Sequence, residues 1–231
     1  MPVKSQQNID VRKRMIDSAI VLFARKGVEQ VSLRELTTDA GVNLAAVNYH
    51  FGSKEELAKI VFEELTKRVN RHRLDRLHEI ETACRASNTL PRLEEIILAF
   101  IEPYTGTANT DEGLLLARLT LRHRTTPSDM TAKLMRKHFD PTAKRYIAAL
   151  AAACPAVPAD EFPWRYTFMV SAVVLTITDR RKDSRLLKLS GGKADPNDSI
   201  SLSAALVRFL ANGMRAPMNL PQALTSVPAS V

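Results

Sequence analysis

Apolar residues along the chain recur at the spacing of α-helices, and no stretch keeps the period of two that marks a β-strand. Near the N-terminus, Ile16, Ile20 and Phe23 lie at positions i, i+4 and i+7 of one stripe, which predicts a helix over residues 10–26. Gly27 follows this stripe and is typical of the position after a helix C-terminus.

The next two predicted helices are short and have clear boundaries. Ser32 and Glu35 have the S-x-x-E spacing of a capping box, which predicts a helix start, and Gly41 ends that helix. Asn43 is a favourable N-cap for a third helix, which runs to about Phe51. The two helices are therefore joined by a turn of only a few residues that contains a glycine.

A fourth helix begins with a second capping box, Ser53 with Glu56, and continues to about Ala86. Residues 179–198 are predicted to form a long connection with a short helical turn at 184–189. Further helices are predicted at residues 91–103, 111–125, 128–154, 159–180 and 198–213. The predicted fold class is all-α.

Charge and hydropathy then limit the partners. The chain has 231 residues and a formal net charge of +8, a balance that suits a polyanion such as nucleic acid or an anionic membrane surface. An ordinary basic soluble protein is the alternative. The longest apolar run, residues 168–177, is far shorter than the ~20 residues that span a bilayer. The first residues lack the apolar region of a secretory signal. We therefore expect a soluble, cytoplasmic protein with no membrane partner.

The sequence favours a binding protein over an enzyme. It contains no G-x-S-x-G, H-E-x-x-H, P-loop or Rossmann glycine pattern. The five histidines are scattered, and Cys84 and Cys154 lack metal-ligand spacing. We expect no catalytic residues, no bound metal and no cofactor.

The second and third helices with their tight turn form a helix-turn-helix pattern. In this motif the second helix lies in the major groove of DNA, and residues near its N-terminus contact base edges. The motif explains why a short helix carries so many polar side chains. The candidate DNA-binding residues are Ser32, Arg34, Asn43, Leu44, Ala45, Ala46, Asn48, Tyr49, His50 and Lys54.

These candidates divide into base and phosphate contacts. Ala45 and Ala46 are small, which allows close approach and contact with a thymine methyl group, and Asn48 can bond adenine in bidentate fashion. The side chains of Tyr49, His50 and Lys54 can hold phosphates, and the start of the second helix adds further phosphate candidates. Structural alternatives stay open: Asn43 and Ser32 as caps, Tyr49 as a core residue, and His50 as a surface histidine.

The stretch "RMIDSAIVLFARKGVEQVSLRELTTDAGVNLAAVNYHFGSKEEL", residues 14–57, resembles the TetR/AcrR family of bacterial transcriptional regulators. The sequence departs from the family pattern at Asn43, Ala45 and Asn48. The resemblance implies a homodimeric repressor that binds a palindromic operator on double-stranded DNA and is released by a small-molecule effector. We expect a DNA-binding domain over residues 9–70, an effector-binding and dimerisation domain over 71–215, and a disordered tail over 216–231.

The second half of the chain is expected to hold the dimer interface and an effector pocket. By resemblance, the helices at 159–180 and 198–213 pair with their counterparts in a second copy. Bundles usually place ligands between helices, and an arginine can hold an anionic effector such as a carboxylate. The pocket candidates are Phe100, Tyr104, Leu115, Leu119, Arg122, Tyr146, Trp164 and Phe168. A DNA-binding scaffold on the same fold, with protein partners and no effector, is the alternative function.

Overall fold

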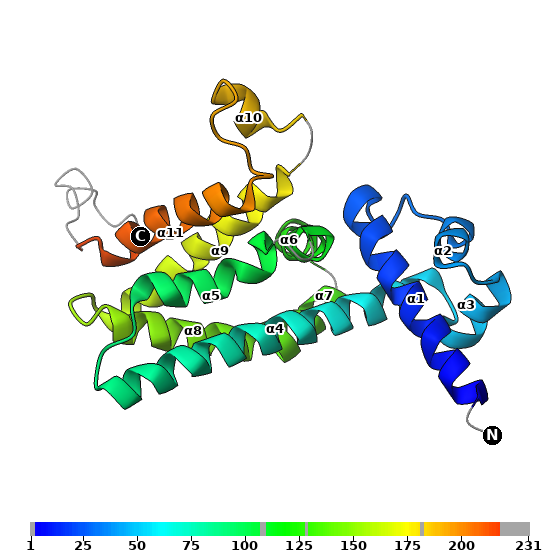
Figure 1. Cartoon of the computed structure of the whole chain (residues 1–231), viewed down its shortest axis with the longest axis horizontal. Coiled ribbons are helices and arrows are strands. Elements are labelled where there is room, and N and C mark those ends of the chain that lie inside the picture. The colour runs from blue at the N-terminus through cyan, green and yellow to red at the C-terminus, as the bar shows by residue number, and fades with distance from the viewer. Residues whose placement is uncertain (1–2, 107–109, 128, 181–182, 218–231) are drawn as a thin grey trace, which may run out of the picture.

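A computed structural model describes residues 3–106, 110–127, 129–180 and 183–217, and these residues form helices and connections without any β-strand. The predicted all-α fold is confirmed. Figure 1 shows a small group of helices at the N-terminal end joined by one long helix to a larger bundle. We call these parts the head and the body. The tail predicted at 216–231 lies outside the described residues from position 218 on.

The head consists of α1 (Val3–Lys26), α2 (Leu33–Ala40), α3 (Leu44–Phe51) and the first turns of α4 (Lys54–Ser87). Helix α1 begins seven residues before the predicted start at residue 10. Each of these helices buries apolar residues in a common core, among them Phe23, Leu36, Val47 and Leu57. The serine half of both predicted capping boxes forms, since the side chains of Ser32 and Ser53 accept hydrogen bonds from the backbone N–H groups of Glu35 and Glu56, each at 3.1 Å. The carboxylates of the two glutamates pair with Lys26 and Lys59.

Helix α4 belongs to both parts of the molecule. It is 34 residues long and contains neither glycine nor proline in its interior. Its first turns bury Leu57 and Val61 in the head, and its later turns bury Arg73 and Leu77 in the body. The head is thus attached to the body by continuous helix (Figure 1).

In the body, α5, α6, η1 and α8 pack against α4. Helix α9 packs on α5, α6 and α8, and α11 packs on α5 and α9. Its elements are α5 (Leu93–Thr105), α6 (Thr110–Thr125), α7 (Asp129–Leu134), η1 (Met135–Phe139), α8 (Asp140–Ala153), η2 (Ala159–Glu161), α9 (Phe162–Thr178), α10 (Arg185–Leu189) and α11 (Ser199–Arg215). The short turn predicted at 184–189 is α10, and the side chain of Asp179 accepts hydrogen bonds from the backbone of its first turn.

The prediction of a single regular α-helix over residues 128–154 was wrong. The structure divides this stretch into α7, the π-helical turn η1 and α8. Pro141 lies in the first turn of α8. Because proline has no N–H and its ring crowds the carbonyl four residues earlier, a regular α-helix cannot pass through this point, and the turn before it is wider.

An ion pair fastens η1 to α4. The carboxylate of Glu63 on α4 accepts a hydrogen bond from Lys137 Nζ at 2.9 Å and lies 3.4 Å from Lys67 Nζ. The bond from Lys137 lowers the pKa of Glu63 to about 2. Because the folded pKa lies below the ordinary value of 4.5, this stabilisation is complete above that pH and is lost as the pH falls towards 2.

We expect Glu63→Gln to remove this acid-sensitive stabilisation. The free energy of unfolding of wild type should exceed that of the variant by a constant amount near neutral pH. The difference should shrink as the pH falls through the window between 4.5 and about 2. Urea denaturation across this range measures it, with Glu64→Gln, an exposed neighbour, as the control. A difference that stays constant to the acid end contradicts the assignment.

Candidate nucleic-acid interface

The turn between α2 and α3 fixes the angle between the two helices. Gly41 has a left-handed φ of 63°, a conformation that glycine adopts without strain. The N–H of Val42 donates to Thr37 O at 2.9 Å, which closes the end of α2. A guanidinium nitrogen of Arg14 donates to Gly41 O at 3.4 Å, so α1 also holds the turn.

Helix α3 has one buried face and one exposed face. Val47 and Phe51, four residues apart, are 0% and 5% exposed and pack in the head core. Leu44, Ala45, Asn48 and Tyr49 are all exposed and repeat at the same helical spacing on the other side. Four of the predicted DNA-binding residues therefore share one solvent-facing surface, which we call the α3 face.

Tyr49 lies on this face and does not join the core. Its side chain is 78% exposed, and its ring makes an edge contact with the half-buried ring of His50, with centroids 5.0 Å apart. The phenol hydroxyl is thus presented to solvent on a ring supported by a neighbour. The core alternative for Tyr49 is wrong, and its predicted phosphate contact stays a prediction.

The other predicted contacts lie around this face. Asn43 is exposed directly before α3, and Arg34 is exposed in the first turn of α2. The Ser32 oxygen accepts the capping hydrogen bond, which leaves its O–H able to donate to a phosphate. The side chain of Ala46 lies outside the described residues.

Lys54 has a structural contact that the sequence pattern did not reveal. Its ammonium group donates to Val31 O at 3.1 Å and to Glu29 O at 3.4 Å. These bonds tie the start of α4 to the connection between α1 and α2. The predicted phosphate contact of Lys54 stays a prediction, and a phosphate would share the ammonium group with these two carbonyl oxygens.

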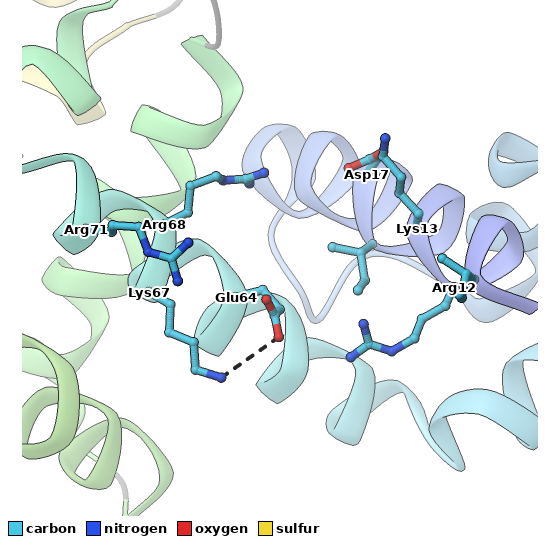
Figure 2. A pocket seen from close by; sticks show the side chains of 9 residues that line it. Arg12, Lys13, Asp17, Glu64, Lys67, Arg68 and Arg71 are labelled. Atoms are coloured by element: carbon cyan, nitrogen blue, oxygen red, sulfur yellow. Dashed lines mark ion pairs between the residues drawn. The ribbon is translucent and has the colours of Figure 1, made fainter. Parts of the chain in front are cut away.

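A basic groove lies between α1 and α4, where the head meets the body (Figure 2). It has a volume of about 440 Å³ and is lined by Ile9, Arg12, Lys13, Ile16, Asp17, Glu64, Lys67, Arg68 and Arg71. Five of these side chains are cationic and two are anionic, so the groove carries part of the net positive charge of the chain. Glu64 is engaged by Lys67 at 3.9 Å.

The eight predicted pocket residues do not form a pocket together. Trp164 and Phe168 are 64% and 62% exposed on α9, and Arg122 forms an ion pair with Glu29 at 2.9 Å. The remaining five are buried in the core of the body: Phe100, Tyr104, Leu115, Leu119 and Tyr146. The sequence pattern was correct about apolar character, but periodicity cannot distinguish a side chain that lines a cavity from one that fills it.

Two further observations concern other classes of site. Within the described ranges, no group of three or more histidine, cysteine, aspartate or glutamate side chains could hold a metal ion. The helices of the same ranges include none with the length and apolar character needed to cross a bilayer.

The geometry of α2, the Gly41 turn and the α3 face defines a helix-turn-helix protein. Comparison with protein families agrees. Residues 15–61 match the model of bacterial regulatory proteins of the tetR family, and residues 98–213 match the tetracyclin repressor-like C-terminal domain. The chain belongs to the TetR family of transcriptional regulators, and the prediction of a regulator that is not an enzyme is supported by this membership.

Two relatives with a described role match a short part of the chain. The chain is 40% identical over 63 residues to the HTH-type nicotine-responsive transcriptional repressor HdnoR of Paenarthrobacter nicotinovorans, a match that covers 27% of this chain and 32% of that one. It is 39% identical over 57 residues to the HTH-type transcriptional dual regulator CecR of Shigella flexneri, covering 25% and 24% of the two chains. The matched stretch spans less than a third of either relative.

Solved structures resemble most of the chain in fold. A transcriptional regulator from Rhodococcus sp. Rha1 has a TM-score of 0.58 at 20% identity, covering 89% of this chain and 98% of its own. A putative transcriptional regulator from Saccharomonospora viridis, in complex with choline, has a TM-score of 0.61 at 16% identity, covering 87% and 95%. At these identities the similarity is one of fold alone.

The α3 face allows base and phosphate contacts to be separated by substitution. Tyr49→Phe removes only the hydroxyl group, so we expect binding to weaken by roughly tenfold on every DNA sequence, the loss of one hydrogen bond to a charged group. Asn48→Ala should instead reduce the preference for adenine at one base pair of each half-site, by ~1–3 kcal/mol.

Fluorescence anisotropy with a selected operator and its single-base variants measures both effects. His78→Ala, an exposed substitution in the body, is the control. If Asn48→Ala weakens all sequences equally, the base-reading role of Asn48 is wrong.

Proposed function

We propose that the chain is a homodimeric repressor that binds a palindromic operator and is released by a small-molecule effector. The observation that carries this proposal is the α3 face, where Leu44, Ala45, Asn48 and Tyr49 are exposed together on a helix whose opposite side is fixed in the core. A helix held in this way can enter the major groove without rearrangement of the head.

The domain roles follow from the position of this face. We assign DNA binding to residues 9–70 and effector binding and dimerisation to residues 71–215. Helix α4 crosses the boundary between them, so the two assigned domains share one continuous backbone.

An exposed apolar surface on α9 and α11 supports a dimer. Trp164, Phe168 and Leu175 repeat along one side of α9 and are each more than 60% exposed, as are Ile200 and Phe209 on α11. Large side chains gathered on neighbouring helices mark an interaction surface, and a twofold interface uses the same surface on both copies. Such a dimer would present two α3 faces to successive major grooves, and a twofold protein reads a palindrome.

Helix α6 offers a route by which the body could influence the head. One guanidinium nitrogen of Arg118 donates to Ala24 O at the end of α1, and Arg122 pairs with Glu29 at 2.9 Å. On its other sides α6 packs against α9 and α5.

The approach of α6 to α5 is very close. A Cβ atom added at Gly113 would lie 2.7 Å from Tyr104 O, so only glycine fits there. We infer that a ligand which displaces α5 or α9 moves α6, and with it the end of α1. An effector shifts this equilibrium only by its difference in affinity for the two arrangements.

The comparisons support a small-molecule effector in general terms. One relative is described as nicotine-responsive, and one solved neighbour holds choline. These ligands belong to those proteins.

A second function is favoured by the packing of the body. Phe100, Tyr104 and Tyr146 fill the space where a pocket was predicted, and each is at most 2% exposed. A closed body suits a DNA-binding scaffold that meets protein partners and needs no effector.

The dimer can be tested by placing a charge on its surface. Phe168→Glu should convert the wild-type dimer to a monomer, because two buried carboxylates would face each other near the twofold axis. Analytical ultracentrifugation measures the mass, and Leu90→Glu, at a leucine that is 66% exposed outside α9 and α11, is the control. A dimer that persists in Phe168→Glu places the interface elsewhere.

The function is tested by selection from a pool of random and genomic DNA at two salt concentrations, with sequencing of the retained fragments. We expect a palindrome with half-sites about one turn apart, and weaker binding at higher salt because phosphate contacts release counterions. Retention without an enriched sequence, or no retention, contradicts the operator-binding proposal.

A further inference from the structure

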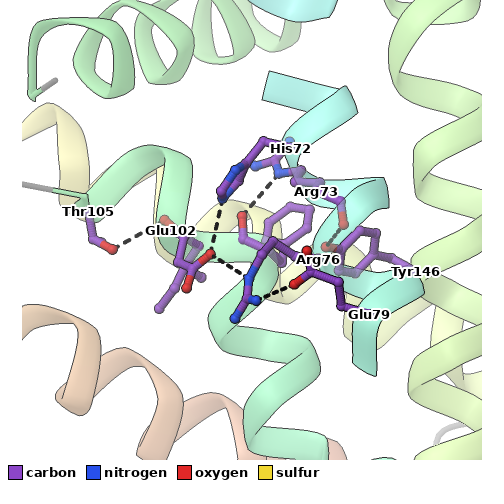
Figure 3. Close-up of polar contacts among 9 residues, drawn as sticks. His72, Arg73, Arg76, Glu79, Glu102, Thr105 and Tyr146 are labelled. Carbon is purple, nitrogen blue, oxygen red and sulfur yellow. Dashed lines mark hydrogen bonds and ion pairs between the residues drawn. The ribbon is translucent and has the colours of Figure 1, made fainter. Parts of the chain in front are cut away.

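Arg73 is a fully buried cation at the centre of the body (Figure 3). Its side chain is 1% exposed and projects from α4 towards α5. Its Nε donates to Phe100 O at 3.0 Å, and its Nη1 donates to Asn70 Oδ1 at the limiting distance of 3.5 Å. Its Nη2 has no hydrogen-bond partner among the described residues.

Nearby carboxylates do not neutralise this guanidinium. Glu102 is engaged by His72 at 3.1 Å and by Arg76 at 3.5 Å, and Glu79 is engaged by Arg76 (Figure 3). Within the described ranges no ion pair reaches Arg73. A buried charge without a counterion destabilises a fold, so its retention requires an explanation.

The other two buried arginines of the body show what a purely structural arginine does in this fold. Arg180 uses all three nitrogens, donating to Pro196 O, Tyr104 O and Ser199 Oγ at 2.8 to 3.1 Å. Arg165 donates to three backbone carbonyls at the end of α11 and lies 3.6 Å from the carboxylate of Glu161. Arg73 differs from both because one of its terminal nitrogens is unused.

Aromatic rings compensate the charge of Arg73 in part. Its guanidinium carbon lies 4.0 Å from the centre of the Phe100 ring and 5.0 Å from that of Tyr104. The hydroxyl of Tyr146 donates to Arg73 O at 3.0 Å and therefore leaves Nη2 unpaired. Because aromatic faces attract cations, and Arg73 already covers two of them, this site is unfavourable for a cationic ligand.

Two more buried polar atoms without a hydrogen bond lie at the seam where α4 meets η1. Thr66, Asn70 and Arg73 occupy positions i, i+4 and i+7 of α4, and all three are buried. The Thr66 hydroxyl has no hydrogen-bond partner, and Nε2 of His138 in η1 makes no hydrogen bond but lies 3.5 Å from Glu63 Oε1. The amide of Asn70 donates to His138 O at 2.5 Å, which places η1 directly against this row.

We call Thr66, Asn70, Arg73 and His138 together the α4–η1 strip. The buried side-chain atoms found without a hydrogen bond in the described residues all belong to it. A π-helical turn forms its opposite wall, and such turns occur frequently at functional sites.

We propose that the α4–η1 strip is the effector site and that the effector carries a carboxylate, which binds the unpaired nitrogen of Arg73. This inference rests on the proposed release by an effector and specifies its chemistry. A carboxylate matches the planar guanidinium in shape and supplies the negative charge that Arg73 lacks nearby. As a monoanion, it also loses less hydration energy on burial than a phosphate dianion. The remainder of the ligand would reach along the strip towards Thr66, about 10 Å away along the helix axis.

Binding at the strip would act on the head through α4 and η1. Arg73 is 1% exposed and does not line the basic groove, so the proposed ligand enters by separating η1 from α4. The ion pair between Glu63 and Lys137 closes the same seam nearer the head. Opening the seam therefore displaces groups on the helix that carries the head.

The test uses the full chain and a panel of matched probes. Acetate, hexanoate, octanoate and benzoate are each compared with the corresponding primary amide and primary amine at millimolar concentration, by thermal unfolding. We expect at least one carboxylate to raise Tm, by roughly 5–10 °C at about 100 times its Kd, with little effect from its amide or amine. If no carboxylate exceeds its amide in the wild-type chain, the inference is overturned, and this comparison needs no variant.

Two variants locate the binding. Arg73→Met keeps an apolar side chain among the same rings and should abolish the rise in Tm caused by the carboxylate. Arg73→Lys keeps the charge but not the planar guanidinium, and should reduce that rise. Arg71→Gln removes the same charge from an exposed residue of the basic groove on the same helix, and should leave the shift intact. A shift that survives Arg73→Met, or disappears in Arg71→Gln, contradicts binding at the strip.

A DNA-release measurement separates this inference from the function on which it rests. The effective carboxylate is added to the complex of the protein with its selected operator. If the carboxylate binds through Arg73 but does not release DNA, the strip is confirmed as a carboxylate site and the proposed release by an effector is contradicted. If an amine releases DNA while no carboxylate binds, effector release holds and the inference about the strip is wrong.

Discussion

The continuity of α4 is the constraint on which the architecture depends. An uninterrupted helix of 34 residues extends for about 50 Å, and every turn inside it is held by backbone hydrogen bonds. Its first turns bury Leu57 and Val61 with the head, and its later turns bury Leu77 with the body. Head and body therefore share one continuous helix, and the contacts between α6 and α1 hold the head against the body at a second place.

The head could be predicted from the sequence in detail because its signals are local. Capping boxes, the Gly41 turn and the apolar spacing each involve residues within one or two helical turns, and the structure shows the expected elements. What the sequence could not decide was the orientation of an amphiphilic side chain. Tyr49 suits a core or a surface equally, and only the packing of Val47 and Phe51 turns it to solvent.

The body was predictable as helices but not as a site, because its chemistry depends on contacts between distant residues. The bond from Arg73 to Phe100 joins positions 27 apart, and that from Tyr146 to Arg73 joins positions 73 apart. In the sequence, Arg73 is one of many charged residues on a long helix. The only local signal was a row of polar residues at i, i+4 and i+7 on the inward side of α4, beginning at Thr66.

The contacts between α6 and the end of α1 have a thermodynamic consequence. In the proposed switch, DNA binding and ligand binding are linked through the contacts of Arg118 with Ala24 and of Arg122 with Glu29. Because such linkage is reciprocal, the two binding equilibria share one coupling free energy, whichever arrangement of these contacts the operator favours. The operator must then weaken ligand binding by the same factor by which the ligand weakens operator binding. The ligand concentration needed for half-saturation would thus rise with the fraction of the protein that is bound to DNA.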